Sequence, residues 1–338
     1  HLIEHYMNDG TGFEEAAEKS AARIKGANAV VVMCNDQPDK IVAFRTGNAG
    51  GVLIGYGDNE MLVASDIPAI LGYTNTISHL LPGELAVLHP NSVQFKDQDG
   101  NPIKKEKTFV PNDPISIAKG DYRHFMLKEI CEQPDAIIAS LMGRLSSEEG
   151  LFSLEDLNLT ADDINKISKV TLTGMGTSLH AAMLARLWME RIAGIPSEWD
   201  NSSEFRYREP LLDENSLFIS ISQSGETADT LAAMEEAKKK NISQITLCNY
   251  SNTQASRIAD QTLQIRAGLE IGVAATKTFT CSLVTLYALA IYLGVQREKI
   301  NGKEAAKLIE ELFRLPEMIG TVLANQGQYE ELATLYHS

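Results

Sequence analysis

Apolar and polar positions alternate over short runs in the first third of the chain. The strand-like runs are Ala29–Met33, Lys40–Arg45, Gly51–Gly55, Met61–Ser65 and Glu84–Leu88. Turn residues such as Asn-Asp, Gly-Asp-Asn and Pro-Gly separate them, which is typical of an antiparallel sheet. The spacing also predicts a helix over Gly12–Ile24, a short helical turn over Ile67–Leu71, and a last hairpin between Ser92 and Ile103.

The periodicity is lost over residues 104–120. This segment holds the charged run Lys104–Lys107 and the loop-forming residues Pro111–Pro114. A solvated connector is the simplest interpretation of such a composition. We therefore expect a first domain over residues 1–110, a linker over 111–128 and a second domain over 129–338.

From Tyr122 onward, helical stretches alternate with short apolar strands. The predicted strands are Lys169–Thr173, Ser216–Ser222, Gln244–Cys248 and Gln261–Ile265. The predicted helices between them are Leu179–Ile195, Thr227–Lys240 and Thr276–Leu293. This alternation predicts an α/β fold with a doubly wound parallel sheet. A long amphipathic segment follows Gly302.

Composition and charge exclude several classes of function. The 338 residues are 44% hydrophobic and 22% charged, enough for two domains with ordinary cores. The formal net charge of −15 is unsuited to a phosphate backbone or an anionic membrane surface. No uninterrupted run of 18 apolar residues occurs. We therefore expect neither nucleic acid nor membrane as a partner.

The chain begins with His1 and shows no signal-peptide pattern, so we expect a piece of a longer chain. The cysteines are widely spaced, without a CxxC motif, and are expected to be free and buried; they are Cys34, Cys131, Cys248 and Cys281. The seven histidines show no metal-ligand spacing. We expect no metal, no cofactor and a cytoplasmic protein.

Two loops that follow a predicted strand and open a predicted helix are rich in small polar residues. The first is Gly174-Met-Gly-Thr-Ser178, and the second is Ser222-Gln-Ser-Gly-Glu-Thr227. A helix N-terminus offers N–H groups and the positive end of the helix dipole to an anion. In an open α/β sheet, such loops meet at the carboxyl ends of the strands. The pair therefore predicts a phosphate-monoester site built from neutral donors.

Other interpretations of these loops have to be weighed. Ser224 or Thr227 taken singly is more typical of a helix N-cap, and only the presence of two such loops favours phosphate. A nucleoside triphosphatase is not supported, since the motif G-x-x-x-x-G-K-[ST] is absent. Gly174-Met-Gly176 begins like a dinucleotide fingerprint, but Leu179 stands in place of its third glycine, where a bulky side chain would prevent close helix–strand packing.

In combination, the motifs of this chain resemble those of the glutamine–fructose-6-phosphate aminotransferases, also called glucosamine-6-phosphate synthases. Besides the two loops, the second extended to Thr230, the matching segments are Met61–Asp66, Tyr122–Ile130, Glu132–Pro134, Ser203–Arg208 and Glu270–Lys277. They are spread over essentially the whole chain. The resemblance implies a protein that uses ammonia, released from glutamine by a glutaminase domain, to convert fructose 6-phosphate to glucosamine 6-phosphate.

The resemblance also implies a fold and a set of binding residues. Residues 1–110 would be the late, β-rich part of an N-terminal-nucleophile (Ntn) glutaminase sandwich, followed by the first of two sugar-isomerase (SIS) domains. The family's phosphate and sugar contacts fall, by motif position, on Thr177, Ser178, Ser222, Gln223, Ser224, Thr227 and the main chain of Val273. Ala275 stands where the family often has serine, a departure that bears on one sugar hydroxyl contact.

No catalytic residue is expected in this chain. The family's glutaminase nucleophile is an N-terminal cysteine, whereas residue 1 is His1. Its ring-opening lysine, glutamate and histidine belong to the second SIS domain, beyond Ser338, and we expect Lys277 to be structural or solvated. The resemblance thus implies a fragment that holds fructose 6-phosphate or glucosamine 6-phosphate, uses glutamine only in the intact enzyme, and dimerises through its SIS domains.

Two alternative functions stay open at this point. One is a non-enzymatic SIS module that senses a phosphosugar, as in some transcriptional regulators, although no basic helix-turn-helix is evident. The other is a sugar-phosphate deglycase, which would need no glutaminase part. Residues 1–110 distinguish them: an antiparallel sandwich favours the amidotransferase, and an unrelated module counts against it.

Overall fold

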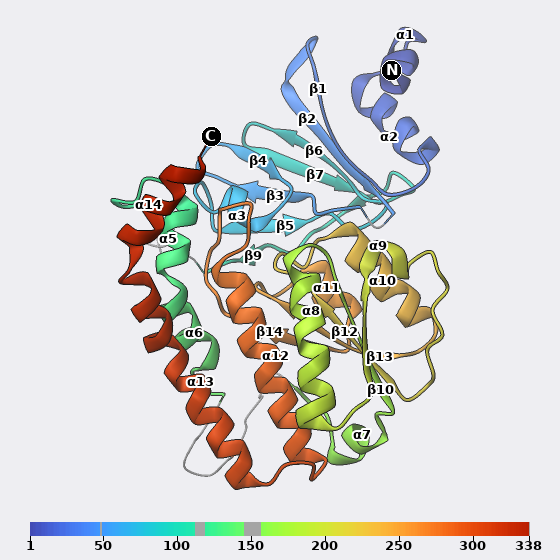
Figure 1. Cartoon of the computed structure of the whole chain (residues 1–338). Helices are drawn as coiled ribbons and strands as arrows, with labels where there is room; N and C mark the ends of the chain where they lie inside the picture. Colours follow the sequence, from blue (N-terminus) through green and yellow to red (C-terminus); the bar gives the residue numbers. More distant parts are fainter. Residues whose placement is uncertain (48, 112–118, 145–156, 338) are drawn as a thin grey trace. The chain divides into compact units, whose positions relative to one another are not determined.

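The structure, a computed structural model, describes residues 1–47, 49–111, 119–144 and 157–337. The chain divides into two compact units, His1–Ala118 and Lys119–Ser338, and each is described by itself (Figure 1). Much of the predicted linker, residues 112–118, lies outside the described residues.

In its described residues, 1–47 and 49–111, the first unit contains two antiparallel sheets and three helices. One sheet has the order β1 (Asn28–Cys34), β2 (Gln37–Thr46), β6 (Leu85–His89), β7 (Ser92–Lys96) and β8 (Pro102–Ile103). The other has the order β4 (Met61–Ala64), β3 (Leu53–Tyr56), β5 (Thr76–His79) and β9 (Thr108–Phe109). The helices are α1 (Leu2–Asn8), α2 (Phe13–Arg23) and α3 (Ile67–Ile70).

The two sheets of the first unit pack face to face, with a helix on the outer side of one of them. Ala43 of β2 and Ile54 of β3 lie in the same buried cluster, so the layers form a sandwich. Because successive strand residues point to opposite faces, Val42 and Phe44 of β2 pack instead against Phe13 of α2. The predicted antiparallel, β-rich character of this region is therefore confirmed.

The hydrophobic pattern missed the shortest elements of this unit. β9 comprises only Thr108 and Phe109, inside the segment predicted to be an irregular connector, and pairs with β5 through Thr76 and Ile77. A pairing of two residues depends on the partner strand and leaves no periodic signal of its own. β5, whose four residues are fewer than the commonest strand length of about five to six, was missed as well.

The second unit is built on a five-stranded, entirely parallel sheet. Its order is β11 (Ser197–Asn201), β10 (Lys169–Gly174), β12 (Ser216–Ile221), β13 (Ser243–Cys248) and β14 (Gln261–Gln264). The doubly wound α/β prediction is confirmed. The edge strand β11 was missed because its sequence, Ser-Glu-Trp-Asp-Asn, is too polar to read as a buried strand.

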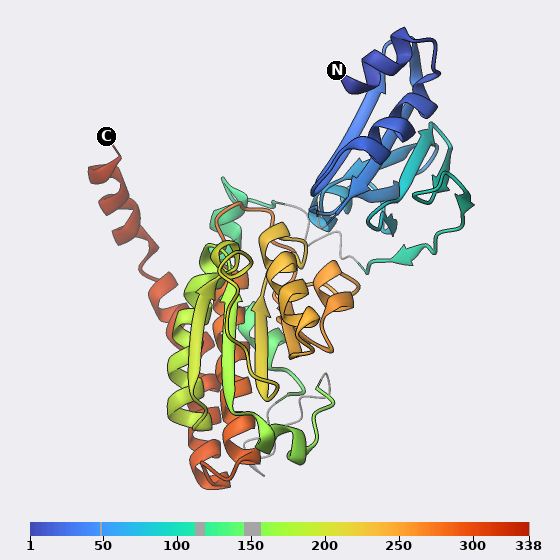
Figure 2. The same ribbon diagram turned by 90° about the vertical axis from the view of Figure 1, so that its right-hand side faces the viewer.

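Helices cover both faces of this sheet (Figures 1 and 2). On one face lie α8 (Thr177–Trp188), its π-helical continuation Met189–Ala193, and α12 (Lys277–Gln296). On the other face lie α9 (Ser202–Phe205), α10 (Ala228–Lys239) and α11 (Gln254–Ile258). α6 (Gln133–Leu141) and α13 (Gly302–Leu323) pack against α12. The remaining described helices are α5 (Phe125–Cys131), α7 (Ala161–Lys166) and α14 (Gln326–Tyr336).

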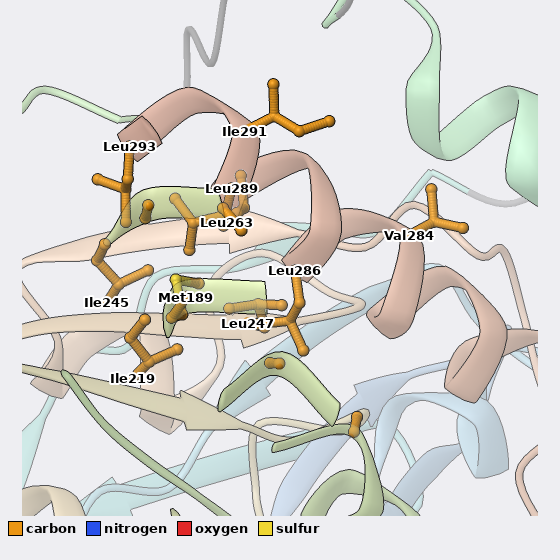
Figure 3. Packing of buried hydrophobic residues seen from close by; sticks show 14 of the residues in the cluster. Met189, Ile219, Ile245, Leu247, Leu263, Val284, Leu286, Leu289, Ile291 and Leu293 are labelled. Carbon is orange, nitrogen blue, oxygen red and sulfur yellow. The ribbon is translucent and has the colours of Figure 1, made fainter. Parts of the chain in front are cut away.

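The main core lies between the sheet and α12. Figure 3 shows Ile219, Ile245 and Leu247 of the strands beneath Leu286 and Leu289 of the helix, all buried. By length and composition α12 could cross a membrane, yet 72% of its most apolar stretch is buried inside the protein. That burial is the ordinary situation of a central helix packed on a sheet.

Leu289→Ala is expected to destabilise the second unit by about 2–5 kcal/mol, because the fully buried leucine leaves a cavity between α12 and the sheet. Both tryptophans of the chain, Trp188 and Trp199, lie in this unit, so their fluorescence during urea unfolding measures the loss. Leu211→Ala, at a leucine that is 91% exposed, is the control and should leave the midpoint unchanged. Equal shifts for both variants would contradict the assigned core.

Candidate functional site

The two predicted loops begin at neighbouring positions on one edge of the parallel sheet. β10 and β12 are adjacent, with Thr173 paired to Ser220, and each loop follows directly. β11 lies on the other side of β10, so the order of the strands reverses between β10 and β12. In open α/β sheets this reversal is where ligands bind. Strand pairing thus places the two loops at the favoured position of the fold.

The second loop gathers its hydroxyls by internal hydrogen bonds. Ser222 is 4% exposed, and its hydroxyl accepts a hydrogen bond from the N–H of Gly225 at 3.1 Å. The hydroxyl of Thr227 lies 3.2 Å from that of Ser222. Ser224 accepts from the N–H of Glu226 at 3.1 Å. Since the Ser224 oxygen only accepts, its proton remains available for a ligand, whereas one proton of the Ser222–Thr227 pair joins these two hydroxyls and the other is available.

Thr227 occupies the N-cap position of α10, which bears on the helix-cap interpretation. For this described helix, no side-chain hydrogen bond caps the N-terminus, and the Thr227 hydroxyl faces Ser222 instead. A capping threonine would accept from a backbone N–H of the first turn. Helix capping therefore does not account for Thr227, whereas the Ser224 contact is an ordinary local turn bond.

Gly225 shapes the turn of the second loop. Its φ of +67° lies in the left-handed region, which favours glycine. A Cβ at this position would lie 2.3 Å from the hydroxyl oxygen of Thr253. The carbonyl of Gly225 also accepts from the N–H of Ala255 at 3.0 Å. The start of α11 therefore packs closely against the loop and holds its backbone in place.

The first loop brings two hydroxyls to the start of α8. Thr177 and Ser178 are the first two residues of this helix and are half-buried. They lie at the positive end of the helix dipole, which favours an anion. A Cβ on Gly174 would come within 2.8 Å of the Ser178 backbone, so glycine permits the tight passage from strand to helix. We refer to the two loops, residues 174–178 and 222–227, as the cradle.

Asn249 connects the cradle to the loop that follows β14. Its N–H donates to the carbonyl of Gln223 at 3.0 Å. Its side-chain amide donates to the carbonyl of Gly268 at 2.6 Å and accepts from the N–H of Ala267 at 2.9 Å. The sequence analysis missed this residue. Its position directly after β13, at the carboxyl edge of the sheet, is the signal that would have drawn attention to it.

Val273 lies on the loop between β14 and α12, apart from the two loops of the cradle. Its side chain is completely exposed. Lys277, at the start of α12, is 5% exposed, and its ammonium lies 2.6 Å from the Glu132 carboxylate. Lys277 is therefore buried in an ion pair and is not a solvated residue.

The cysteines are free, and the cradle contains none of them. Burial raises the pKa of Cys248 to about 11 and that of Cys281 to about 12. Cys34 and Cys131 are half-buried. Among the described residues, no group of three or more His, Cys, Asp or Glu side chains could hold a metal ion.

Comparison with known proteins agrees with this geometry. The SIS domain profile matches residues 163–292. The glutamine–fructose-6-phosphate aminotransferase of Symbiobacterium thermophilum is 42% identical over 318 residues, covering 94% of this chain and 52% of the relative. Its counterpart in Caldanaerobacter subterraneus is 40% identical over 337 residues, covering 100% of this chain and 55% of the relative. The chain thus spans about half the length of these curated relatives.

A solved structure supports the fold of the second unit. The C-terminal domain of the glucosamine-fructose-6-phosphate aminotransferase from Francisella tularensis superimposes with a TM-score of 0.61 at 34% identity. The match covers 64% of this chain and 60% of that chain. Together with the curated relatives, it confirms the resemblance that the motifs indicated.

Gly225→Ala is expected to destabilise the second unit more than Gly143→Ala. Both glycines have a left-handed φ, which costs alanine about 1–2 kcal/mol. Only at Gly225 would the new methyl group also meet Thr253, whereas nothing lies within 4 Å at Gly143. This overpacking adds typically about 1–3 kcal/mol. Urea unfolding followed by tryptophan fluorescence measures the difference, and equal losses would contradict the close packing at Gly225.

At pH 8, iodoacetamide is expected to alkylate Cys34 and Cys131 and to spare Cys248 and Cys281. The thiolate is the reactive species, and a thiol with a pKa near 11 is ionised in roughly one molecule in a thousand at this pH. Peptide mass mapping identifies the modified residues. In urea, all four should react equally; rapid reaction of Cys248 in the folded protein would contradict its burial.

Proposed function

Because the chain is homologous along its length to the glutamine–fructose-6-phosphate aminotransferases, we propose that its second unit binds fructose 6-phosphate and the product glucosamine 6-phosphate. In this proposal the chain supplies the sugar-phosphate cradle of an enzyme that converts fructose 6-phosphate to glucosamine 6-phosphate. The observation that carries it is that two hydroxyl-bearing loops follow the paired strands β10 and β12 at the reversal point of the parallel sheet.

The phosphate group is assigned to the hydroxyls of the cradle. Ser222, Ser224 and Thr227 supply three donors on one loop, and the N-terminal ends of α8 and α10 supply favourable dipoles. Thr177 and Ser178 complete the set from the other loop. These donors are neutral and short, so a chain with a net charge of −15 needs no lysine to hold a dianion here.

The sugar is assigned to the groups around the phosphate cradle. Gln223 lies within the cradle loop, and its side chain is half-buried. The main chain of Val273 provides the second assigned contact. Ala275, two residues further along, offers no hydroxyl for a third contact. We assign no catalytic residue and no cofactor to this chain.

The first unit is assigned to the late part of a glutaminase domain, and the remaining partners follow from that assignment. Its two packed antiparallel sheets are the arrangement expected of an Ntn glutaminase, and they favour an amidotransferase over a phosphosugar sensor or a deglycase. Glutamine would be a substrate of the intact enzyme only. We further propose a cytoplasmic homodimer formed through the SIS domains.

The double substitution Ser224→Ala with Thr227→Ala is expected to weaken binding of fructose 6-phosphate. Each hydrogen bond lost to a charged phosphate costs about 1.5–3 kcal/mol. Isothermal titration calorimetry with fructose 6-phosphate measures the loss, and unphosphorylated fructose gives the baseline. The matched control is Ser168→Ala, whose hydroxyl bonds to Asp213 at the opposite edge of the sheet.

Two outcomes of this titration would count against the proposal. Unchanged affinity in the double variant would favour a purely structural role for the hydroxyls. Equal, negligible binding of fructose 6-phosphate and fructose by the unsubstituted chain would contradict the phosphate cradle itself. A similar loss in Ser168→Ala would show that the effect is not specific to the cradle.

A further inference from the structure

The loop that carries Val273 is clamped at both ends by buried carboxylates. Residues 265–276 connect β14 to α12. The Val273 loop is the later part of this connection, residues 270–276, in which the side chains of Val273 and Ala274 are exposed. Glu129 holds the start of this loop and Glu270 holds its end, and the two glutamates are 2% and 5% exposed. A loop fixed at both ends presents the main chain between them in a defined position.

Glu129 reaches the loop from α5, far away in the sequence. Its Oε1 accepts hydrogen bonds from the N–H of Ile271 at 2.6 Å and from the N–H of Gly272 at 3.0 Å. A Cβ on Gly272 would lie 2.5 Å from Oε2 of the same carboxylate. The contact is therefore both charge-assisted and sterically close. Hydrogen bonds to an ionised carboxylate are stronger than those between neutral groups.

Glu270 fixes the other end of the loop to the start of α12. Its carboxylate accepts from the N–H of Thr276 at 2.9 Å, from the Thr276 hydroxyl at 3.1 Å and from the N–H of Thr278 at 3.3 Å. A negative charge at a helix N-terminus is favourable because of the helix dipole. This contact caps α12 and does not depend on α5.

We propose that Glu129 is a positioning residue for sugar recognition: by holding the N–H groups of Ile271 and Gly272, it sets the place of the Val273 main chain. This inference rests on the proposed function, because it takes the Val273 main chain as a sugar contact. The phosphate cradle has contacts of its own, through Ser222, Gly225 and the start of α11. Asn249 ties it to Ala267 and Gly268, which lie outside the stretch that Glu129 holds. Loss of Glu129 should therefore affect the sugar and leave the phosphate unaffected.

Amide hydrogen exchange tests the positioning without any ligand. In Glu129→Ala, the N–H groups of Ile271 and Gly272 lose their acceptor and should exchange at least about tenfold faster. The N–H groups of Gly225 and Thr276 keep theirs and should exchange as before. Unchanged exchange at Ile271 and Gly272, measured residue by residue by NMR, would overturn the inference. Faster exchange throughout the second unit would also overturn it, since the effect would then be general.

Binding of two ligands tests the consequence for recognition. We expect Glu129→Ala to bind fructose 6-phosphate about tenfold more weakly, the equivalent of one good hydrogen bond, and inorganic phosphate with unchanged affinity. Glu129→Gln should stay within about threefold of the original, because its amide oxygen can still accept from both N–H groups. Glutamine also fills the space of glutamate, so Glu129→Met, which fills it without a strong acceptor, separates the two roles and should bind both ligands as Glu129→Ala does.

Ser140→Ala is the matched control. It removes a buried hydroxyl that lies 3.1 Å from the Thr285 hydroxyl, between α6 and α12, and should lower stability without changing the ratio of the two affinities. If Glu129→Ala lost affinity for both ligands to the same extent, the inference would be overturned. It would also be overturned if this variant kept the original affinity for both. A chain that binds fructose 6-phosphate no better than inorganic phosphate would overturn it too. Binding of neither ligand by the unsubstituted chain would instead refute the proposed function.

Discussion

The parallel pairing of β10 with β12 is the constraint on which the site depends. The register that joins Thr173 to Ser220 makes both strands end together, so both following loops open at the same edge. The pairing is secured by burial on both faces: Ile219 of β12 packs toward α12, and Phe218 packs toward α10. A slip of one residue would exchange these faces. The geometry of the cradle is thus a consequence of core packing.

The site combines rigid loops with neutral donors. The cradle is held by backbone contacts to the serine hydroxyls, by the α11 contact at Gly225, and by Asn249, which reaches across to the loop after β14. The one carboxylate of the cradle, Glu226, accepts from the N–H of Gln254 at the start of α11, and Glu129 accepts backbone hydrogen bonds of the Val273 loop. An acidic protein can therefore offer a place for an anion, because these carboxylates already have donors and the cradle presents hydroxyls and helix N-termini.

Much of the fold could be predicted from the sequence, and two of the missed strands share one cause. The buried strands β10, β12 and β13 were recognised by their apolar residues, and the partly buried β14 was recognised with them from the alternation of helices and strands. The polar edge strand β11 and the two-residue β9 were missed, since each is defined by its neighbour. In the site, the hydroxyl-rich loops were evident, whereas Asn249 and Glu129 were not, because their partners lie far from them in the sequence.

Taken alone, the sequence determined the order of the elements, the two loops and the family that their motifs resemble, because periodicity, turn residues and short motifs are local properties of a chain. The tertiary structure decided which loops meet, which hydroxyls face one another, and which residues hold the Val273 loop. Glu129 contacts Ile271 across 142 positions of sequence, and no local pattern encodes such a pair. Contacts of that kind arise only when the packed sheet brings its loops and the neighbouring helix α5 together.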